Sequence, residues 1–192
     1  MFTGIIEEIG VITDIRKEGG NIHFTLSSAI SKELKIDQSV AHNGCCLTVV
    51  DLQNDTHTVT AIHETLVKTN LSDWKIGSKI NLERCMSLNG RLDGHIVQGH
   101  VDGLARCVSV EDEDGSWRFR FEYQSDFVTV EKGSVTINGT SLTVVDSSDS
   151  AFSVCIIPYT FEHTNFHTLS VGDEVNLEFD IIGKYVARLM NR

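Results

Sequence analysis

The sequence is short of several features that mark whole classes of protein. Among its 192 residues there is one proline, and aromatic side chains make up 7% of the chain. No apolar run approaches the roughly 18 residues that a membrane-spanning helix requires. The first ten residues carry no basic cluster followed by a long apolar core, so we expect no secretory signal peptide. These absences favour a soluble, cytoplasmic globular protein.

Positive charge is also scarce. The chain has 16 Lys and Arg against 27 Asp and Glu, a formal net charge of −11. Nucleic acids and anionic lipid surfaces attract cationic proteins, so neither is an expected partner. The motifs GxGxxG, GxxxxGK[ST], HExxH and GxSxG are absent, which argues against a dinucleotide-binding fold, a P-loop enzyme, a zinc protease and an α/β hydrolase.

The five cysteines form no CxxC pair, so the spacing supports neither a zinc site nor a redox pair. Their number is odd, and two of them are adjacent in the chain. We expect reduced thiols at Cys45, Cys46, Cys85, Cys107 and Cys155. The cysteines therefore give no indication of a metal site.

What the sequence does contain is an internal repeat with a constant offset of 95 residues. Segments 39–51 and 134–146 share nine of thirteen residues, and the match continues without a gap from 58–71 to 153–166 and from 76–83 to 171–178. A long repeat that occurs twice indicates two homologous domains. We expect an N-terminal domain over 1–88, a linker over 89–95 and a C-terminal domain over 96–180.

Each half has the pattern of a small β-barrel. The segment 117–123 (WRFRFEY) alternates aromatic with charged residues, which is typical of a half-buried strand. Asn-Gly pairs at 43–44 and 138–139 stand between β-branched runs and predict tight hairpin turns. Six strands in each half, with a short helix near 29–34, predict an all-β fold of two tandem six-stranded barrels.

The last twelve residues have no counterpart in the first half. Ile182, Tyr185, Val186 and Leu189 recur at helical spacing, so we expect an amphipathic C-terminal helix over 181–192. Two roles remain open at this point. The helix either packs on its own domain or associates with another chain.

Differences between matched positions single out candidate chemistry. Cys46 in the first half matches Ser141 in the second, and His100 matches Ile5. A thiol, a hydroxyl and an imidazole can move protons or hydrogen-bond a polar ligand, although a plain structural role would also explain each. Glu64, Thr65 and Thr160 lie where they could cap short helices.

These motifs together resemble riboflavin synthase, a family of single-chain enzymes with two lumazine-binding barrels. The resemblance rests on MFTGI at the start, SVAHNGCCLTV, GHIVQGHVDG, SVTINGTSLTVV and VNLEFD…KYVARL, and it covers essentially the whole chain. It implies Greek-key barrels and a homotrimer assembled through the C-terminal helices. The active site would lie between the N-terminal barrel of one subunit and the C-terminal barrel of another.

The reaction that this resemblance implies is a dismutation. Two molecules of 6,7-dimethyl-8-ribityllumazine exchange a four-carbon unit and give riboflavin and 5-amino-6-ribitylamino-uracil, without a cofactor or metal. The resemblance makes His100 the proton-transfer group, assisted by Cys46 and Ser141. The two substrates play unequal roles, which fits the differences between the halves.

The resemblance also implies two sets of substrate contacts. One pocket would comprise Gly4, Ile5, Ile6, Lys132, Leu142, Thr143, Ile157, Pro158, Tyr159, Thr160, Phe161 and Glu162. The other would comprise Leu47, Thr48, Thr60, Ala61, Ile62, His63, Glu64 and Thr65, with Ser39, His95 and Phe2 in supporting positions. Asp93 and Tyr159 depart from the glycine and histidine expected there.

Other functions are compatible with parts of the pattern. The main alternative is a non-catalytic antenna-type protein that binds lumazine or flavin, but such relatives tend to lose the Cys and His that this chain keeps. A flavin reductase would need a further dinucleotide domain. A purely structural duplicated barrel would leave the differences at Cys46, Ser141 and His100 unexplained.

Overall fold

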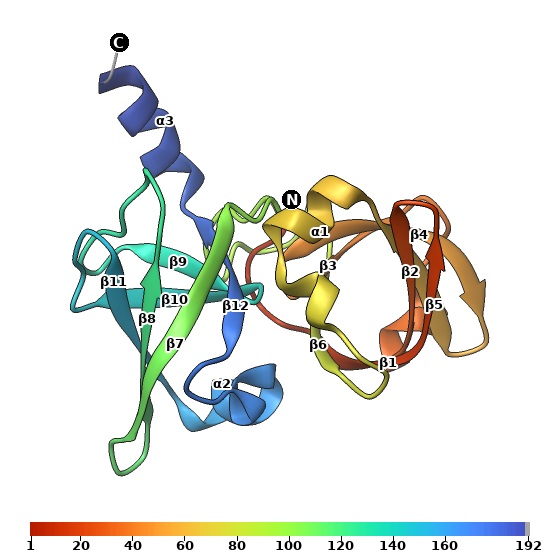
Figure 1. Cartoon of the computed structure of the whole chain (residues 1–192), viewed down its shortest axis with the longest axis horizontal. Coiled ribbons are helices and arrows are strands. Elements are labelled where there is room, and N and C mark those ends of the chain that lie inside the picture. The colour runs from red at the N-terminus through yellow and green to blue at the C-terminus, as the bar shows by residue number, and fades with distance from the viewer. Residues whose placement is uncertain (191–192) are drawn as a thin grey trace.

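The computed structural model describes residues 1–190 and contains two closed antiparallel barrels of six strands each (Figure 1). This confirms the all-β fold class. The first barrel has the strand order β1-β2-β5-β4-β3-β6, with β6 pairing back onto β1. Its strands are β1 (Glu8–Glu18), β2 (Asn21–Ser27), β3 (Ser39–His42), β4 (Cys45–Gln53), β5 (Thr56–Ala61) and β6 (Lys79–Arg84). Its helices are η1 (Ala29–Glu33), α1 (His63–Lys68) and η2 (Asn70–Asp73).

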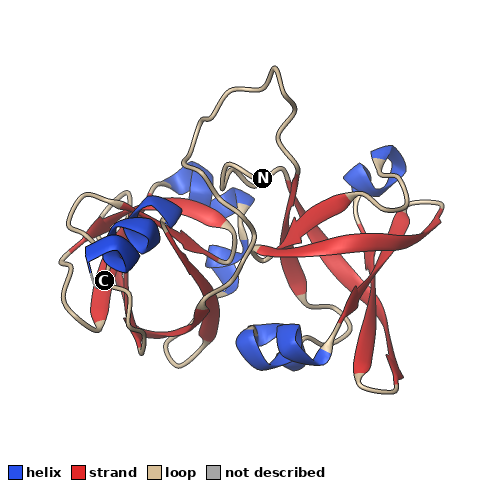
Figure 2. Ribbon diagram, turned by 90° about the horizontal axis from the view of Figure 1, so that it is seen from above, coloured by secondary structure: helices blue, strands red, loops and turns tan. Residues whose placement is uncertain are grey.

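The second barrel repeats this order as β7-β8-β11-β10-β9-β12, and the two barrels lie side by side (Figure 2). Its strands are β7 (Gly103–Asp112), β8 (Trp117–Tyr123), β9 (Ser134–Ile137), β10 (Thr140–Val145), β11 (Ala151–Ile156) and β12 (Glu174–Phe179). Its helices are α2 (Pro158–His163) and η3 (Asn165–Thr168), and α3 (Ile181–Met190) follows the last strand.

Local sequence explains the hairpins and the cores. Both residues of each Asn-Gly pair adopt positive φ, at 46° and 76° for Asn43 and Gly44, as a two-residue hairpin turn requires. In β8 the alternate aromatic residues point inward, so that Phe119 and Phe121 are fully buried. Each barrel has its own apolar core, and the predicted strand pattern is confirmed in both.

The barrels meet through buried asparagine side chains. Asn81 Nδ2 donates to the backbone oxygen of Asn138, and Asn176 Nδ2 donates to that of Asn43, both at 2.9 Å. The two hairpin turns face each other so closely that a Cβ on Gly44 would lie 2.7 Å from the backbone nitrogen of the facing glycine in the other barrel. Since each amide is buried and hydrogen-bonded, separating the barrels would leave these polar groups without their partners.

Helix α3 extends away from the second barrel (Figure 1). None of its residues is buried, and Ile182, Tyr185, Val186 and Leu189 are 49–67% exposed along one stripe. Its apolar face therefore does not pack on its own domain, which favours association with another chain as the role of that face. Residues 191 and 192 of the expected helix lie outside the described residues. No helix in residues 1–190 is long and apolar enough to cross a membrane.

Two buried imidazoles distinguish the first barrel from the second. His42 Nε2 lies 2.9 Å from His57 Nε2, and neither residue is exposed. The matched positions in the second barrel are Ile137 and Phe152, which belong to its apolar core. Burial lowers the pKa of His42 to about 3, with the neighbouring His57 as the second cause, and burial lowers the pKa of His57 to about 4.

Two neutral rings satisfy all the hydrogen bonds of this pair. His42 Nδ1 must donate to the Val40 oxygen at 3.0 Å, so its Nε2 accepts from His57 Nε2–H. His57 Nδ1 then accepts from the Ser31 hydroxyl at 2.7 Å. In this arrangement a proton added to His42 Nε2 would face the N–H of His57 inside the barrel.

We predict that this histidine pair makes the free energy of unfolding fall at acid pH. Because the folded-state pKa values are lowered, the unfolded chain binds more protons below pH 6.5, and stability falls as the pH drops from 6.5 towards the folded values near 4 and 3. The loss should be about 1.4 kcal/mol per pH unit for each imidazole over that range. Urea unfolding from pH 7.5 to 4.5 measures it.

The second barrel supplies the matched control. The double variant His42→Ile and His57→Phe carries the residues found at positions 137 and 152, and it should lose much of this pH dependence. An identical pH profile for the two proteins would contradict the assignment.

Candidate functional site

The segments that precede the two barrels lie together. We define residues 1–6 as the first lead segment and residues 96–101 as the second. Phe2 and Val97 form a reciprocal bridge, with N–H donated to oxygen at 2.7 and 3.1 Å in the two directions. Phe2, Val97 and Ala41 form a small buried cluster of their own. The first residues of the chain are thus packed between the two barrels' segments and are not a free end.

Each lead segment crosses to the opposite barrel. The backbone N–H of Cys46 in the first barrel donates to the Gly99 oxygen at 2.9 Å. The backbone N–H of Ser141 in the second barrel donates to the Gly4 oxygen at 2.7 Å. The matched positions Cys46 and Ser141 are therefore covered by equivalent segments. His100 comes to the Cys46 side, and Ile5 comes to the Ser141 side.

Two buried carboxylates anchor the lead segments. Glu83 accepts the N–H groups of Thr3 and Gly4 at 2.6 and 3.0 Å. Glu178 accepts those of Gln98 and His100 at 2.7 and 2.9 Å. Burial raises the pKa of both carboxyls, and the hydrogen bonds from the lead segments oppose this effect.

Sequence reasoning missed the importance of these carboxylates. Glu83 and Glu178 occupy the same position of the repeat, next to Leu82 and Leu177 in strands that are otherwise buried. A charged residue kept at both copies of a buried strand was the available signal, because such a group needs nearby partners.

The first pocket is a cavity of about 250 Å³ beside Cys46. Five predicted residues line it: Cys46, Ile62, Glu64, Thr65 and His100. Five more were not predicted: Cys45, Lys68, Thr69, Gly99 and Val101. Burial raises the pKa of the Cys46 thiol, and a hydrogen bond with Ser39 opposes the rise. Near neutral pH this group is a protonated thiol that can donate a hydrogen bond.

The second site is defined by contacts around Ser141. The hydroxyl of Ser141 lies 2.7 Å from His95 Nδ1, and His95 Nε2 lies 3.2 Å from the Thr136 hydroxyl. Burial lowers the pKa of His95, which favours the neutral imidazole. The sequence placed His95 only in a supporting position, whereas the structure makes it the direct partner of Ser141.

The other predicted contact residues do not gather around these two centres with their side chains. Leu47 and Ala61 point into the first core, and Leu142 and Phe161 pack against the second. Thr60 bonds His23 Nδ1 at 2.9 Å on the outer wall. Ser39 is the exception, because it hydrogen-bonds the Cys46 thiol. The remaining residues line no cavity described above: Thr48, His63, Lys132, Thr143, Ile157, Pro158, Tyr159 and Glu162 are exposed, whereas Ile6 and Thr160 are half-buried.

The expected capping by Glu64, Thr65 and Thr160 is wrong. Helices α1 and α2 begin after Ile62 and Ile157, and neither has a side-chain cap. Thr65 and Thr160 instead supply carbonyl oxygens, to the hydroxyls of the threonines four residues later at 2.6 Å. Those later threonines cap η2 and η3. The contact that both halves share is therefore the junction between the two short helices, and not a cap on the first turn of α1 or α2.

The two departures from the expected pattern lie at the surface. Asp93 is exposed and pairs with Arg91 at 3.3 Å. Tyr159 is 67% exposed and stacks on His163, with ring centroids 4.0 Å apart. Neither contacts Cys46, Ser141 or His100.

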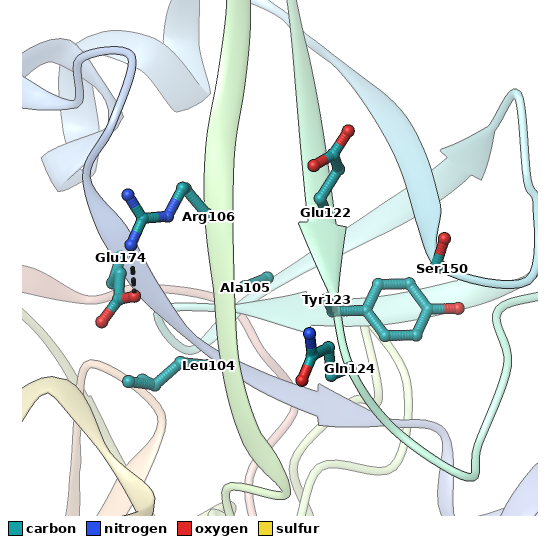
Figure 3. A pocket seen from close by; sticks show the side chains of 8 residues that line it. All are labelled: Leu104, Ala105, Arg106, Glu122, Tyr123, Gln124, Ser150 and Glu174. Carbon is teal, nitrogen blue, oxygen red and sulfur yellow. Dashed lines mark hydrogen bonds and ion pairs between the residues drawn. The ribbon is translucent and has the colours of Figure 1, made fainter.

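Larger cavities lie elsewhere on the molecule, the largest at about 710 Å³ beside His23 and Thr60 of the first barrel. A cavity of about 480 Å³ lies on the outer wall of the second barrel, where Arg106 and Glu174 form an ion pair at 3.1 Å (Figure 3). Tyr123 and Ser150 come from the opposite side of this cavity (Figure 3). None of the predicted site residues lines it, so the smaller pocket at Cys46 is the better candidate.

Comparison with known proteins identifies the family. The lumazine binding domain model matches twice, over residues 3–85 and 98–180. Riboflavin synthase of Actinobacillus pleuropneumoniae is 41% identical over 193 residues, which cover 99% of this chain and 90% of the relative. The chain belongs to the riboflavin synthase family, and it is an enzyme.

Further relatives agree across bacteria. Riboflavin synthase of Bacillus subtilis is 39% identical over 100% of this chain and 91% of its own. That of Mycobacterium bovis is 41% identical, covering 99% of this chain and 98% of the relative. The solved structure of LumP complexed with riboflavin has a TM-score of 0.86 at 24% identity, covering 93% of this chain and 98% of that one. This last likeness shows the fold.

We predict that Gly99→Ala disrupts the second lead segment. Gly99 has a φ of 78°, and a Cβ there would lie 2.7 Å from Cys46 Cβ and 2.8 Å from Phe2 Cε2. The variant should lose more than about 1 kcal/mol of stability and most of its turnover. Thermal unfolding and steady-state kinetics measure the two effects.

Gly103→Ala is the matched control, because nothing lies within 4 Å of a Cβ at that position. It should behave much like the parent protein. Equal behaviour of the two variants would refute the close approach at Gly99.

Proposed function

We propose that this chain catalyses the dismutation of two molecules of 6,7-dimethyl-8-ribityllumazine to riboflavin and 5-amino-6-ribitylamino-uracil. Support comes from relatives named riboflavin synthase at about 40% identity over nearly the full chain. The observation that carries the proposal is the crossing of the lead segments, which places His100 at the pocket of Cys46.

The reaction balances without a further reactant. One lumazine gives up a four-carbon unit, formed by its two methyl carbons and the two ring carbons that bear them, and keeps the two ring nitrogens as amino groups. The other lumazine gains these four carbons as the new ring of riboflavin. The two products together contain all the atoms of the two substrates, so the exchange needs no external oxidant or reductant.

In the proposal, the first pocket begins the carbon–carbon chemistry. His100 accepts a proton from the acidic 7-methyl group of one lumazine, as a positioned imidazole can near neutral pH. Cys46, kept as a thiol by burial, donates a hydrogen bond to the ring. Glu178 fixes the backbone of His100 and leaves its side chain exposed towards the pocket.

The second site holds the other lumazine. Ser141 hydrogen-bonds the ring or adds to it, with neutral His95 as the proton acceptor for its hydroxyl. Because the groups at Cys46 and Ser141 differ, one site would hold the donor and the other the acceptor. Orientation of the two rings supplies much of the acceleration in this scheme.

The proposal also includes a homotrimer. The two sites sit on separate barrels of one chain, and a reaction between two lumazines requires sites that face each other. Helix α3 leaves Ile182, Tyr185, Val186 and Leu189 exposed on one face, which suits association with copies of itself. Pairing the first pocket of one subunit with the second site of another would complete the active site.

The stoichiometry of the reaction tests the proposal. The purified protein is mixed with 6,7-dimethyl-8-ribityllumazine alone, and both lumazine and riboflavin are followed by absorbance and chromatography. We expect one riboflavin for every two lumazines consumed, because each turnover uses one donor and one acceptor.

The antenna-type alternative predicts a different result. Tight binding of lumazine with no riboflavin formed would reject the dismutase and favour a carrier. Asp93 and Tyr159 would then be the first residues to revert to the family pattern.

A second prediction concerns His100. The variant His100→Ala should fold normally, because the side chain is exposed, and should lose on the order of a hundredfold in turnover. His167→Ala is the control, since that imidazole bonds Lys79 at 3.1 Å and lines neither site. Unchanged turnover in His100→Ala would remove this residue from the mechanism.

A further inference from the structure

Two acidic residues occupy equivalent positions just after the two lead segments. Glu7 in the first half matches Asp102 in the second at the 95-residue offset. Each accepts a backbone N–H from the end of its own barrel's last strand. The N–H of Arg84 donates to Glu7 at 2.6 Å, and that of Phe179 donates to Asp102 at 2.9 Å.

The cation that neutralises each acid comes from a different place. In the first half Arg84 supplies its own guanidinium, with Nε and Nη2 at 2.8 and 2.6 Å from Glu7. The matched residue of the second half is Phe179, which has no charge. There Lys184 of helix α3 reaches Asp102, with its Nζ at 2.6 and 2.8 Å from the two carboxylate oxygens.

This ion pair is more enclosed than the others of the described residues. The side chains of Lys184 and Asp102 are 14% and 17% exposed, whereas each other pair has at least one partner above 28%. An enclosed pair is screened less by water and holds its geometry more firmly than a surface pair. Lys184 lies on the inner side of a helix whose apolar stripe faces away from the barrel.

The contact leads directly to the first pocket. Asp102 is two residues beyond His100, and its own N–H donates to the Leu177 oxygen at 2.9 Å. Glu178, on the same strand, accepts the N–H groups of Gln98 and His100. Lys184 therefore adds to the contacts that hold the second lead segment at Gln98, at His100 and at the adjoining Asp102.

We propose that Lys184 is a positioning residue: through Asp102 it fixes the second lead segment, and so couples the docking of helix α3 to the placement of His100. The role in turnover rests on the proposed function, but the structural coupling does not. The first half has no such coupling, because its cation belongs to the barrel itself.

The test compares three variants of the full-length chain. Lys184→Met keeps the aliphatic stem and removes the charge, and Lys184→Arg restores a cation. Arg188→Met is the matched control, since it removes a charge from the same helix one turn later and forms no ion pair within residues 1–190. Amide hydrogen exchange at Gln98 and His100, molar mass by light scattering, and steady-state kinetics with the lumazine are measured for each.

In Lys184→Met we expect the amide hydrogens of Gln98 and His100 to exchange on the order of tenfold faster. The kcat should fall about tenfold or more, with little change in KM. Lys184→Arg should recover most of both properties, and Arg188→Met should match the parent. Unchanged exchange at Gln98 and His100 in Lys184→Met would overturn the proposal, as would an equal effect in Arg188→Met.

Failure of the proposed function would look different. If the parent protein makes no riboflavin but Lys184→Met still exchanges these amides faster, the coupling holds and the reaction is rejected. If Lys184→Met loses molar mass while the two amides keep their protection, Lys184 serves assembly alone and the positioning role is rejected.

Discussion

The docking of the two barrels through buried asparagine amides is the constraint on which the rest of the structure depends. Asn81 and Asn176 each give their side-chain N–H to a backbone oxygen at the opposite hairpin turn. The turns approach so closely that neither Gly44 nor Gly139 has room for a Cβ. This fixed separation lets each lead segment reach across to the other barrel. Neither candidate site is complete on an isolated barrel, because the strand that carries Cys46 or Ser141 needs the oxygen of a segment from the other half.

The repeat has kept its framework and changed its chemistry. Glu83 and Glu178 each accept two backbone N–H groups of a lead segment, as burial of a carboxylate requires, although the second donor is Gly4 in one half and His100 in the other. The anchored segments carry an imidazole, His100, against an isoleucine, Ile5, and the strands that they cover carry a thiol, Cys46, against a hydroxyl, Ser141. Framework positions are constrained by many buried partners, whereas an exposed side chain such as His100 can change without disturbing the fold.

The sequence allowed the barrels to be predicted because their signals are local. Alternating residues such as Phe119 and Phe121, and the Asn-Gly turns, each dictate a conformation over a few residues. The site was only partly predictable, since its contacts are not local. The pairing of His95 with Ser141 joins residues 46 positions apart, and no local sequence pattern predicts it. Helix capping was mistaken for a similar reason: Thr65 and Thr160 were identified as caps from their type, but their carbonyls serve the next turn instead.

The protonation states of the site groups favour catalysis by orienting the substrates rather than by a strong nucleophile. Burial keeps Cys46 as a thiol and His95 as a neutral imidazole, so the pocket presents hydrogen-bonding groups rather than a preformed strong nucleophile. A proposed reaction that only redistributes four carbons between two identical molecules gains most from bringing the rings into the correct relative orientation. In the proposed scheme, the 250 Å³ pocket at Cys46 would enclose part of one lumazine and leave its reacting face open towards a second. An open face of this kind has a function only when another lumazine-bearing surface covers it.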